Sequence, residues 1–149
     1  MIIWIDGDSC PQDIKQIVYK AAIRTNTVLK YIANSYHKIP KNKLFSLVIV
    51  DRSLDAADQH IIDHIKEDDI VITADIPLAY EAVLKKTYVL SPRGQVYNEN
   101  NIREKIQMRD LLQELRSAGE VSGGPRPFEN KDRIKFANAL DKIIQQASS

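Results

Sequence analysis

Short apolar runs alternate with amphipathic segments along the first 90 residues of the chain. Apolar runs that lack an alternating polar face are typical of strands buried on both faces of a sheet. The predicted strands are Ile2–Ile5, Thr27–Ala33, Leu47–Val50, Ile70–Thr73 and Thr87–Leu90. Apolar residues at helical spacing predict helices at Gln12–Arg24, from Asp55 to about Lys66, and at Pro77–Lys85. Because strands and helices alternate, we expect a mainly parallel sheet flanked by helices.

The pattern changes after Leu90. Ser91-Pro92-Arg93-Gly94 predicts a turn, and Gln95–Tyr97 predicts a brief edge strand. Helices are predicted from Glu99 to about Ala118 and from Asn130 to about Gln146. The expected packing residues of the last helix are Ile134, Phe136, Ala137, Leu140, Ile143 and Ile144. With these C-terminal helices packed on the sheet, we expect a three-layer α/β fold in a single domain over residues 1–149.

Composition narrows the range of partners and compartments. The chain has 149 residues, with 21 basic and 20 acidic side chains and one cysteine. A net charge near zero gives no overall attraction to nucleic acid or membrane, so such a partner would need a local patch. Cys10 cannot form an internal disulfide and the N-terminus lacks a signal-peptide pattern, so we expect a cytoplasmic protein. No apolar run approaches the length of a membrane span, so no membrane partner is expected.

Five aspartates follow predicted strands or open predicted helices. Asp6 and Asp8 come after the first strand, Asp75 comes after a later one, and Asp55 and Asp58 open the second predicted helix. The carboxyl ends of parallel strands lie on one edge of a sheet, where open α/β folds bind their ligands. We therefore expect these carboxylates to converge.

The charge of such a cluster indicates a cation. Two unit charges about 4 Å apart repel by roughly 1 kcal/mol in water and about 4 kcal/mol at an effective dielectric near 20. Carboxylate oxygens suit Mg²⁺ and Mn²⁺, and Mg²⁺ completes its coordination with water and substrate phosphate. The sequence therefore predicts an Mg²⁺ or Mn²⁺ site acting on a phosphate ester, with Asp6, Asp8, Asp55, Asp58 and Asp75 as candidate ligands.

Most of these acids also have a simpler structural explanation. Asp55 fits a helix N-cap with Asp58 as its capping-box partner, Asp75 fits the cap of the next helix, and Asp8 fits a turn. Asp58 differs, because it is aligned with the apolar face of its helix and an inward charge needs a partner.

Other chemistry-bearing residues are weaker candidates. His60 and His64 have the spacing of a zinc pair, but no third ligand of the usual type is near in sequence, which favours a solvated helix face. Cys10 lies at a predicted helix start, which lowers a thiol pKa, but its carboxylate neighbours oppose this and favour packing or capping.

Several residues are candidates for contact with a phosphate-containing substrate. Ser9 and Thr73 lie beside the acids, basic side chains offer a rim, and two glycines offer backbone N–H groups. The basic and glycine candidates are Arg93, Arg126, Arg133, Lys85, Lys86, Gly123 and Gly124. Surface solubility explains scattered lysine and arginine equally well.

Segments spread over nearly the whole chain resemble the uncharacterised bacterial YaiI/YqxD family. The matching segments are Ile5-Asp6-Gly7-Asp8-Ser9-Cys10-Pro11, Asp55-Ala56-Ala57-Asp58, Asp69 to Ala79, Ser91-Pro92-Arg93-Gly94, and Gly123-Gly124-Pro125 followed by Asp132-Arg133. The match is specific, but it implies little about function because the family has no established activity.

That family is in turn similar to a branch of the PIN-like fold, whose metal-dependent ribonucleases gather acids at the ends of parallel strands. The resemblance implies that Asp6, Asp58 and Asp75 are catalytic, with Thr73 beside Asp75 in a Thr-x-Asp pattern. It also implies phosphodiester cleavage by metal-activated water. Three departures stand out: Asp58 occupies a position that is often Glu, Asp8 is additional, and no fourth acid follows the fifth strand, so Asp8 or Asp55 is a candidate replacement.

Three functions are compatible with these residues. The leading hypothesis is a metal-dependent nuclease or phosphoesterase acting on RNA or single-stranded nucleic acid. The second is a non-catalytic nucleic-acid-binding or adaptor protein with a vestigial site. The third is a phosphatase of the haloacid-dehalogenase type, with Asp6 as nucleophile and Asp8 as acid/base. It ranks lower because the acidic pair Asp68-Asp69 precedes its strand instead of following it. The sequence sets neither the number of metal ions nor the oligomeric state.

Overall fold

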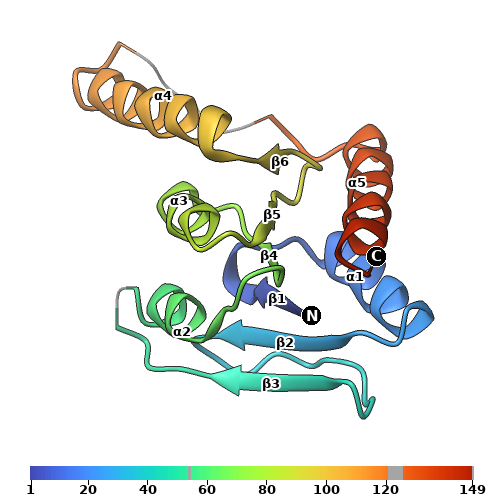
Figure 1. The fold of residues 1–149 in the computed structure, drawn as a ribbon. Helices are drawn as coiled ribbons and strands as arrows, with labels where there is room; N and C mark the ends of the chain where they lie inside the picture. Colours follow the sequence, from blue (N-terminus) through green and yellow to red (C-terminus); the bar gives the residue numbers. More distant parts are fainter. Residues whose placement is uncertain (54, 121–125, 149) are drawn as a thin grey trace.

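The chain folds around a six-stranded sheet in the order β3-β2-β1-β4-β5-β6 (Figure 1). The computed structural model describes residues 1–53, 55–120 and 126–148. The strands are β1 (Ile2–Asp6), β2 (Val28–Ala33), β3 (Phe45–Ile49), β4 (Ile70–Ile72), β5 (Tyr88–Leu90) and β6 (Val96–Tyr97). The first five run parallel and β6 pairs antiparallel with β5. The predicted α/β class with a mainly parallel sheet is therefore confirmed.

Helices cover both faces of this sheet and give three layers (Figure 1). They are α1 (Gln12–Arg24), α2 (Ala56–His64), α3 (Ile76–Leu84), α4 (Glu99–Ser117) and α5 (Asn130–Ser148), with a short 3-10 turn η1 (Gly7–Ser9) after β1. The helices α1 and α5 pack on one face, and α2 and α3 on the other. The helix α4 packs on α3 and extends beyond the sheet (Figure 1). This arrangement is consistent with a three-layer PIN-like fold.

The central strands are apolar on both sides because both faces of the sheet are covered. In β1, Ile3 and Ile5 belong to the core under α1 and α5, whereas Trp4 belongs to the core under α2 and α3. In β4, Ile70 and Ile72 again face the first core. Burial on both faces explains why these strands read as continuous apolar runs.

Most element boundaries predicted from the sequence agree with the structure within about two residues. The first helix begins at Gln12 as predicted, with Pro11 at its N-cap position. Ile134 was expected in the core of the last helix and is 55% exposed. The buried stripe of α5 includes Asp132, Phe136 and Leu140, and Ile134 lies two residues from the first two, on the opposite side of the helix.

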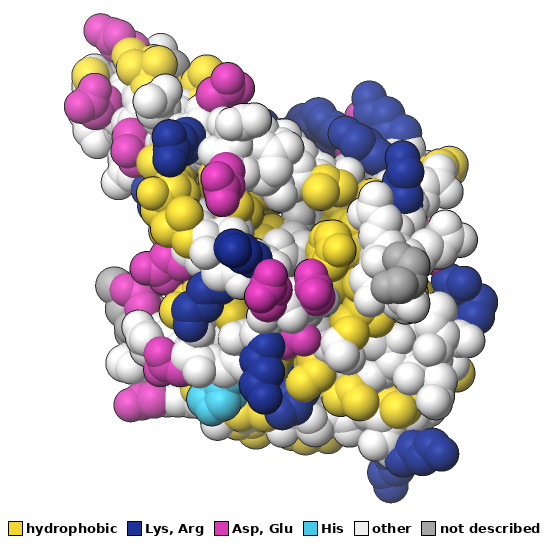
Figure 2. All heavy atoms as spheres, in the orientation of Figure 1, with side chains coloured by type: hydrophobic (Ala, Val, Ile, Leu, Met, Phe, Trp, Pro, Cys, Tyr) yellow, Lys and Arg dark blue, Asp and Glu magenta, His cyan; other side chains and the backbone are white. Residues whose placement is uncertain are grey.

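Positive and negative side chains are interspersed over the face seen in Figure 2 and do not form one large basic field. This distribution agrees with the net charge of +1. Within the ranges that the structure describes, no helix is long and apolar enough to cross a membrane.

Candidate functional site

The strand order reverses direction between β1 and β4, and the candidate site lies at the carboxyl ends of these two strands. The strands β2 and β3 lie on one side of β1, and β4, which follows β3 in sequence, lies on the other side of β1. Ile5 of β1 pairs with Ile72 of β4, so the next residues, Asp6 and Thr73, are neighbours. Open α/β sheets bind ligands at such a switch point.

Asp6 is the buried acid of the site, with a side chain held by two hydroxyl groups. It is 5% exposed. Thr73 Oγ1 donates to Asp6 Oδ2 at 2.7 Å, and Ser9 Oγ donates to the same oxygen at 2.8 Å. Burial raises the pKa of Asp6, the two hydroxyl hydrogen bonds oppose this rise, and the nearby charges of Asp75 and Asp8 add to it.

The two hydroxyls also tie the site to the backbone after β4. Ser9 Oγ accepts a hydrogen bond from the Ala74 N–H at 3.1 Å, and Thr73 Oγ1 accepts from the Asp75 N–H at 3.0 Å. Each hydroxyl therefore links Asp6 to the segment that carries Asp75. These bonds fix the orientation of the Asp6 carboxylate, while the predicted substrate contacts of Ser9 and Thr73 stay predictions.

Asp75 combines a helix cap with membership of the acidic cluster. It is the N-cap of α3, and its Oδ1 accepts from the Leu78 N–H at 3.0 Å. The structural explanation offered by the sequence is therefore correct for Asp75. The cap does not remove its charge from the site, because that charge raises the pKa of both Asp6 and Asp58.

Asp58 is the acid whose protonation the site changes most. It lies in the first turn of α2 and is half-buried. Its pKa is raised to about 7 by burial first, then by the charges of Asp75, Asp6 and Asp55, and by a side-chain hydrogen bond with Asp75. The group that lies beside the inward-pointing Asp58 is thus another carboxylate, that of Asp75.

Asp55 occupies the N-cap position of α2 but makes no side-chain capping bond there. Its backbone is left-handed, with φ of +69°, a conformation that Asp tolerates better than most residues. The helix-cap explanation therefore does not account for this side chain. Asp55 is exposed, and its charge adds to the field that acts on Asp58.

Asp8 is held by the loop that follows β2. Its Oδ2 accepts from the Asn34 N–H at 2.9 Å, and its Oδ1 lies 3.3 Å from Nε2 of His37. The other ring nitrogen of His37, Nδ1, is 2.5 Å from the Tyr31 hydroxyl. Gly7 is needed here because a Cβ at this position would overlap the Tyr31 ring. The aspartate–glycine–aspartate sequence is thus shaped partly by the packing of Tyr31.

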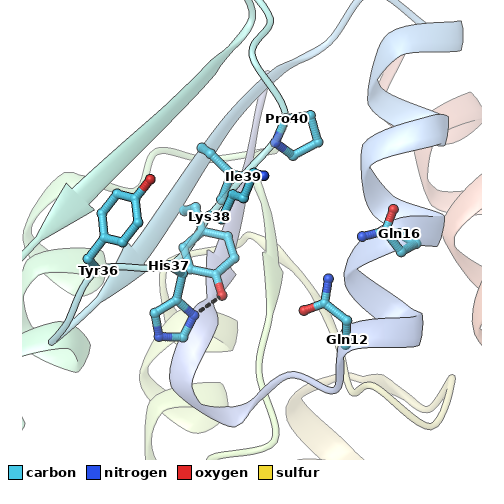
Figure 3. A pocket seen from close by; sticks show the side chains of 8 residues that line it. Gln12, Gln16, Tyr36, His37, Lys38, Ile39 and Pro40 are labelled. Atoms are coloured by element: carbon cyan, nitrogen blue, oxygen red, sulfur yellow. Dashed lines mark hydrogen bonds between the residues drawn. The ribbon is translucent and has the colours of Figure 1, made fainter.

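The hydrogen bond between His37 and the Tyr31 hydroxyl lies at the edge of another hollow, of about 630 Å³ (Figure 3). Gln12 and Gln16 extend from α1 on one side, and the loop carrying His37, Lys38 and Pro40 forms the other. Because Asp8 contacts Asn34 and His37, it connects the acidic cluster to the loop that forms this second wall, in addition to contributing negative charge.

The five predicted aspartates line one hollow of about 290 Å³. Its wall comprises Asp6, Asp8, Ser9, Asn34, Arg52, Ser53, Asp55, Ala56, Ala57, Asp58 and Asp75. The expected convergence is therefore observed, and we call this space the acidic hollow. Sequence reasoning missed Asn34 and Arg52, although both follow the strands β2 and β3 at the same edge of the sheet.

Within the part of the chain that the structure describes, no three His, Cys, Asp or Glu side chains are arranged so that they could hold a metal ion. The hydroxyl and backbone donors around Asp6, Asp8 and Asp75 occupy several of their oxygens. The carboxylates are thus gathered without forming a ready-made coordination shell.

The three arginines of the predicted basic rim are divided between two ion-pair groups. Arg126 binds Asp132 through two hydrogen bonds, of 2.8 and 2.6 Å, and Arg93 Nη1 lies 3.3 Å from the same carboxylate. Hydrogen bonds from Arg126 hold the pKa of Asp132 well below its usual range. Arg133 instead pairs with Asp13 of α1 at 2.7 Å. Gly123 and Gly124 lie outside the described residues.

The other candidate residues, Cys10, His60, His64 and Lys85, make contacts that fit packing or structural roles. Burial raises the pKa of the Cys10 thiol to about 12, which argues against a reactive thiolate and agrees with packing. His60 and His64 stack at 4.1 Å between ring centres and lie beside Trp4. Lys85 donates to the carbonyl of Ile62.

Comparison with known proteins settles the family. Residues 4–146 match the sequence pattern described as "Uncharacterized BCR, YaiI/YqxD family". The chain belongs to the YaiI/YqxD family. The family resemblance expected from the short motifs is thereby confirmed.

Full-length relatives support this membership. A UPF0178 protein of Legionella pneumophila is 49% identical over 147 residues, which cover 99% of both chains. One of Psychromonas ingrahamii is 47% identical over 147 residues, covering 99% of this chain and 97% of its own. One of Hahella chejuensis is 43% identical over 148 residues, covering 99% of both. No solved structure matches the chain.

Proposed function

We propose that the chain hydrolyses phosphodiester bonds of RNA or single-stranded nucleic acid in the acidic hollow, with the help of Mg²⁺ or Mn²⁺. The main support is that Asp6, Asp58 and Asp75 come from three separate segments and line one hollow, where burial and then the charge of Asp75 raise the pKa of both Asp6 and Asp58. Their meeting point is the switch point of an open parallel sheet, which supports a ligand site over a set of unrelated helix caps.

The donor atoms fit a hard divalent cation in kind. They are carboxylate oxygens, and the raised pKa of Asp58, due first to burial and then to the charges of Asp75, Asp6 and Asp55, reflects the negative charge gathered here. Asp6 and Asp75 are the proposed principal ligands, with Asp58 and then Asp8 or Asp55 as further candidates. When bound, the cation would lower the pKa of a coordinated water and neutralise charge on the phosphoryl oxygens.

Asp6 acts in this proposal as the fixed carboxylate of the site. Both hydroxyl hydrogen bonds go to its Oδ2, so its plane is set before any ligand arrives. Pre-orientation of this kind reduces the reorganisation needed during a reaction. Ser9 and Thr73 are therefore positioning residues in the proposed mechanism.

Asp58 is suited to moving a proton. A carboxyl group with a pKa near 7 exchanges its proton readily at neutral pH and can protonate a leaving oxygen or accept a proton from water. Its half-buried position beside Asp75 keeps it at the edge of the space where a phosphodiester would lie.

The test is cleavage of single-stranded RNA by the purified chain. Wild type is expected to cleave with Mn²⁺ and to stop in EDTA. Asp6→Asn and Asp75→Asn are each expected to lower the rate by at least about 100-fold, the usual scale for losing a catalytic carboxylate. Asp63→Asn is the matched control, because Asp63 is an exposed acid on α2 that bonds Gln59. RNA that stays intact with Mn²⁺, or equal cleavage by all four proteins, contradicts the proposal.

A second candidate is a nucleic-acid-binding or adaptor protein with a vestigial site. It is favoured by the lack of a ready three-residue ligand group among the described residues. It predicts salt-dependent RNA binding that EDTA does not change, without cleavage. The phosphatase alternative gains no support, because the carboxylate of Asp8 is engaged with Asn34 and His37.

A further inference from the structure

A second hollow, of about 420 Å³, lies beside the acidic one, and Ser9 lines both. The chemistry of its wall is different. It includes Arg93, Gln95, Tyr97, Lys105 and Phe128, so aromatic and basic side chains replace the carboxylates. We call it the Phe128 hollow.

A cation–π contact between Arg93 and Phe128 forms part of this wall. The guanidinium carbon of Arg93 lies 4.8 Å from the centre of the Phe128 ring. The guanidinium is held in place by Asp132 Oδ2 at 3.3 Å, by the Pro127 carbonyl at 3.4 Å and by the Arg126 carbonyl. Two flat groups are thus fixed at the edge of the hollow, and flat groups are the surfaces on which nucleobases stack.

The side chains at this hollow also carry more positive charge than the carboxylate of Asp132 neutralises. Arg93 and Arg126 share the single carboxylate of Asp132, which leaves one charge of this group uncompensated by Asp132. Lys105 is half-buried and takes part in none of the ion pairs formed among the described residues. A polyanion running past the acidic hollow needs such cations, because the aspartates repel it.

From these contacts we infer that the Phe128 hollow binds a nucleobase of single-stranded nucleic acid, next to the phosphodiester that occupies the acidic hollow. The base stacks against Phe128 and Arg93, and Lys105 neutralises a flanking phosphate. The inference rests on the proposed function for its neighbour, but binding in this hollow needs neither metal nor cleavage.

A single strand is required because the bases of a duplex present only their edges to a protein. An aromatic ring and a guanidinium can stack only on an exposed base, and such stacking accepts any sequence. The substrate class is therefore single-stranded nucleic acid of mixed sequence.

The experiment measures binding in EDTA, by fluorescence anisotropy, of a short single-stranded RNA and of an abasic oligonucleotide with the same backbone. Phe128→Leu keeps an apolar side chain but removes the ring, and it is expected to weaken RNA binding by about tenfold while leaving the abasic oligonucleotide unaffected. The control is Phe45→Leu, since Phe45 is also partly buried against the same core. Thermal denaturation confirms that each variant folds.

Lys105→Gln gives a second test, because the substitution keeps a long polar side chain at this half-buried position and removes only its charge. It is expected to weaken binding of both oligonucleotides, whereas Arg103→Gln, an exposed change on the same helix, has no effect. Equal affinity of wild type for RNA and abasic oligonucleotide, or unchanged RNA binding by Phe128→Leu and Lys105→Gln, overturns the inference. Base-dependent binding without cleavage supports the inference and contradicts only the proposed hydrolysis.

Discussion

The convergence of Asp6, Asp58 and Asp75 in one hollow was predictable from the sequence, because each residue stands at a position that the local pattern fixes. Asp6 and Asp75 follow apolar strands, and Asp58 is aligned with the buried side of its helix. The partners of Asp8 were not identifiable, because Asn34 and His37 belong to an irregular loop whose path depends on packing against Tyr31. Strand ends can be located from periodicity, whereas loop contacts cannot.

The raised pKa of Asp58 makes folding stability depend on pH. Its folded-state pKa of about 7 lies above the ordinary value of 3.8, so the stability it contributes is present at low pH and lost as the pH rises through 7. The contribution of Asp58 to the free energy of unfolding in EDTA is expected to fall by about 1 kcal/mol from pH 5 to 8, after allowance for solvent screening. Urea denaturation at several pH values measures this change.

Asp58→Asn should flatten this profile, because an amide cannot lose the proton. Asp63→Asn, on the exposed side of the same helix, should leave the wild-type slope intact. Identical slopes for wild type and Asp58→Asn would show that Asp58 does not titrate against its neighbours as the structure indicates.

Among the elements, the turn before β6 and the helix α5 hold the Phe128 hollow in place. The predicted turn at Ser91 to Gly94 packs directly against α5, and Arg93 reaches Asp132 at the start of that helix. The helix and the turn were each predictable from periodicity and turn residues. The contact between the turn and the helix was not predictable, because Arg93 and Asp132 are 39 residues apart and no local sequence pattern indicates that they pair.

Gly94 is the residue on which this contact depends. It has φ of +84°, and a Cβ there would lie 2.7 Å from backbone atoms of Lys135 and Phe136. Gly94→Ala is expected to cost more than about 2 kcal/mol of stability, since strain and a backbone clash act together. Gly119→Ala is the matched control, because Gly119 has φ of +77° with open space around it and should cost only about 1 kcal/mol. Equal losses in urea denaturation would contradict the tight packing at Gly94.

At the scale of the whole molecule, the strand order creates the site. Alternating strands and helices predicted a mainly parallel sheet, but not that the chain would return across β1 to add β4. That return brings Thr73 and Asp75 next to Asp6. The site was therefore predictable as a set of strand ends, while the pairing of particular ends required the topology.

The mixed surface charge predicts a modest salt dependence of RNA binding. The two hollows offer about three cations for phosphates, namely Arg52, Arg93 and Lys105. For single strands this corresponds to a slope of about −2 in a plot of log affinity against log salt concentration. Anisotropy titrations at several salt concentrations measure the slope, and a value steeper than about −5 would indicate a broad basic interface, which contradicts binding through the two hollows.

The proposed hydrolysis depends on Asp6 and Asp75 binding a divalent cation together. The most direct measurement is a crystal structure of the chain with Mn²⁺, using anomalous scattering to locate the ion. An anomalous peak is expected within coordination distance of a carboxylate oxygen of Asp6 and one of Asp75. A map at saturating Mn²⁺ without such a peak, with Asp6 still bound only by Ser9 and Thr73 and Asp75 still capping α3, would contradict it.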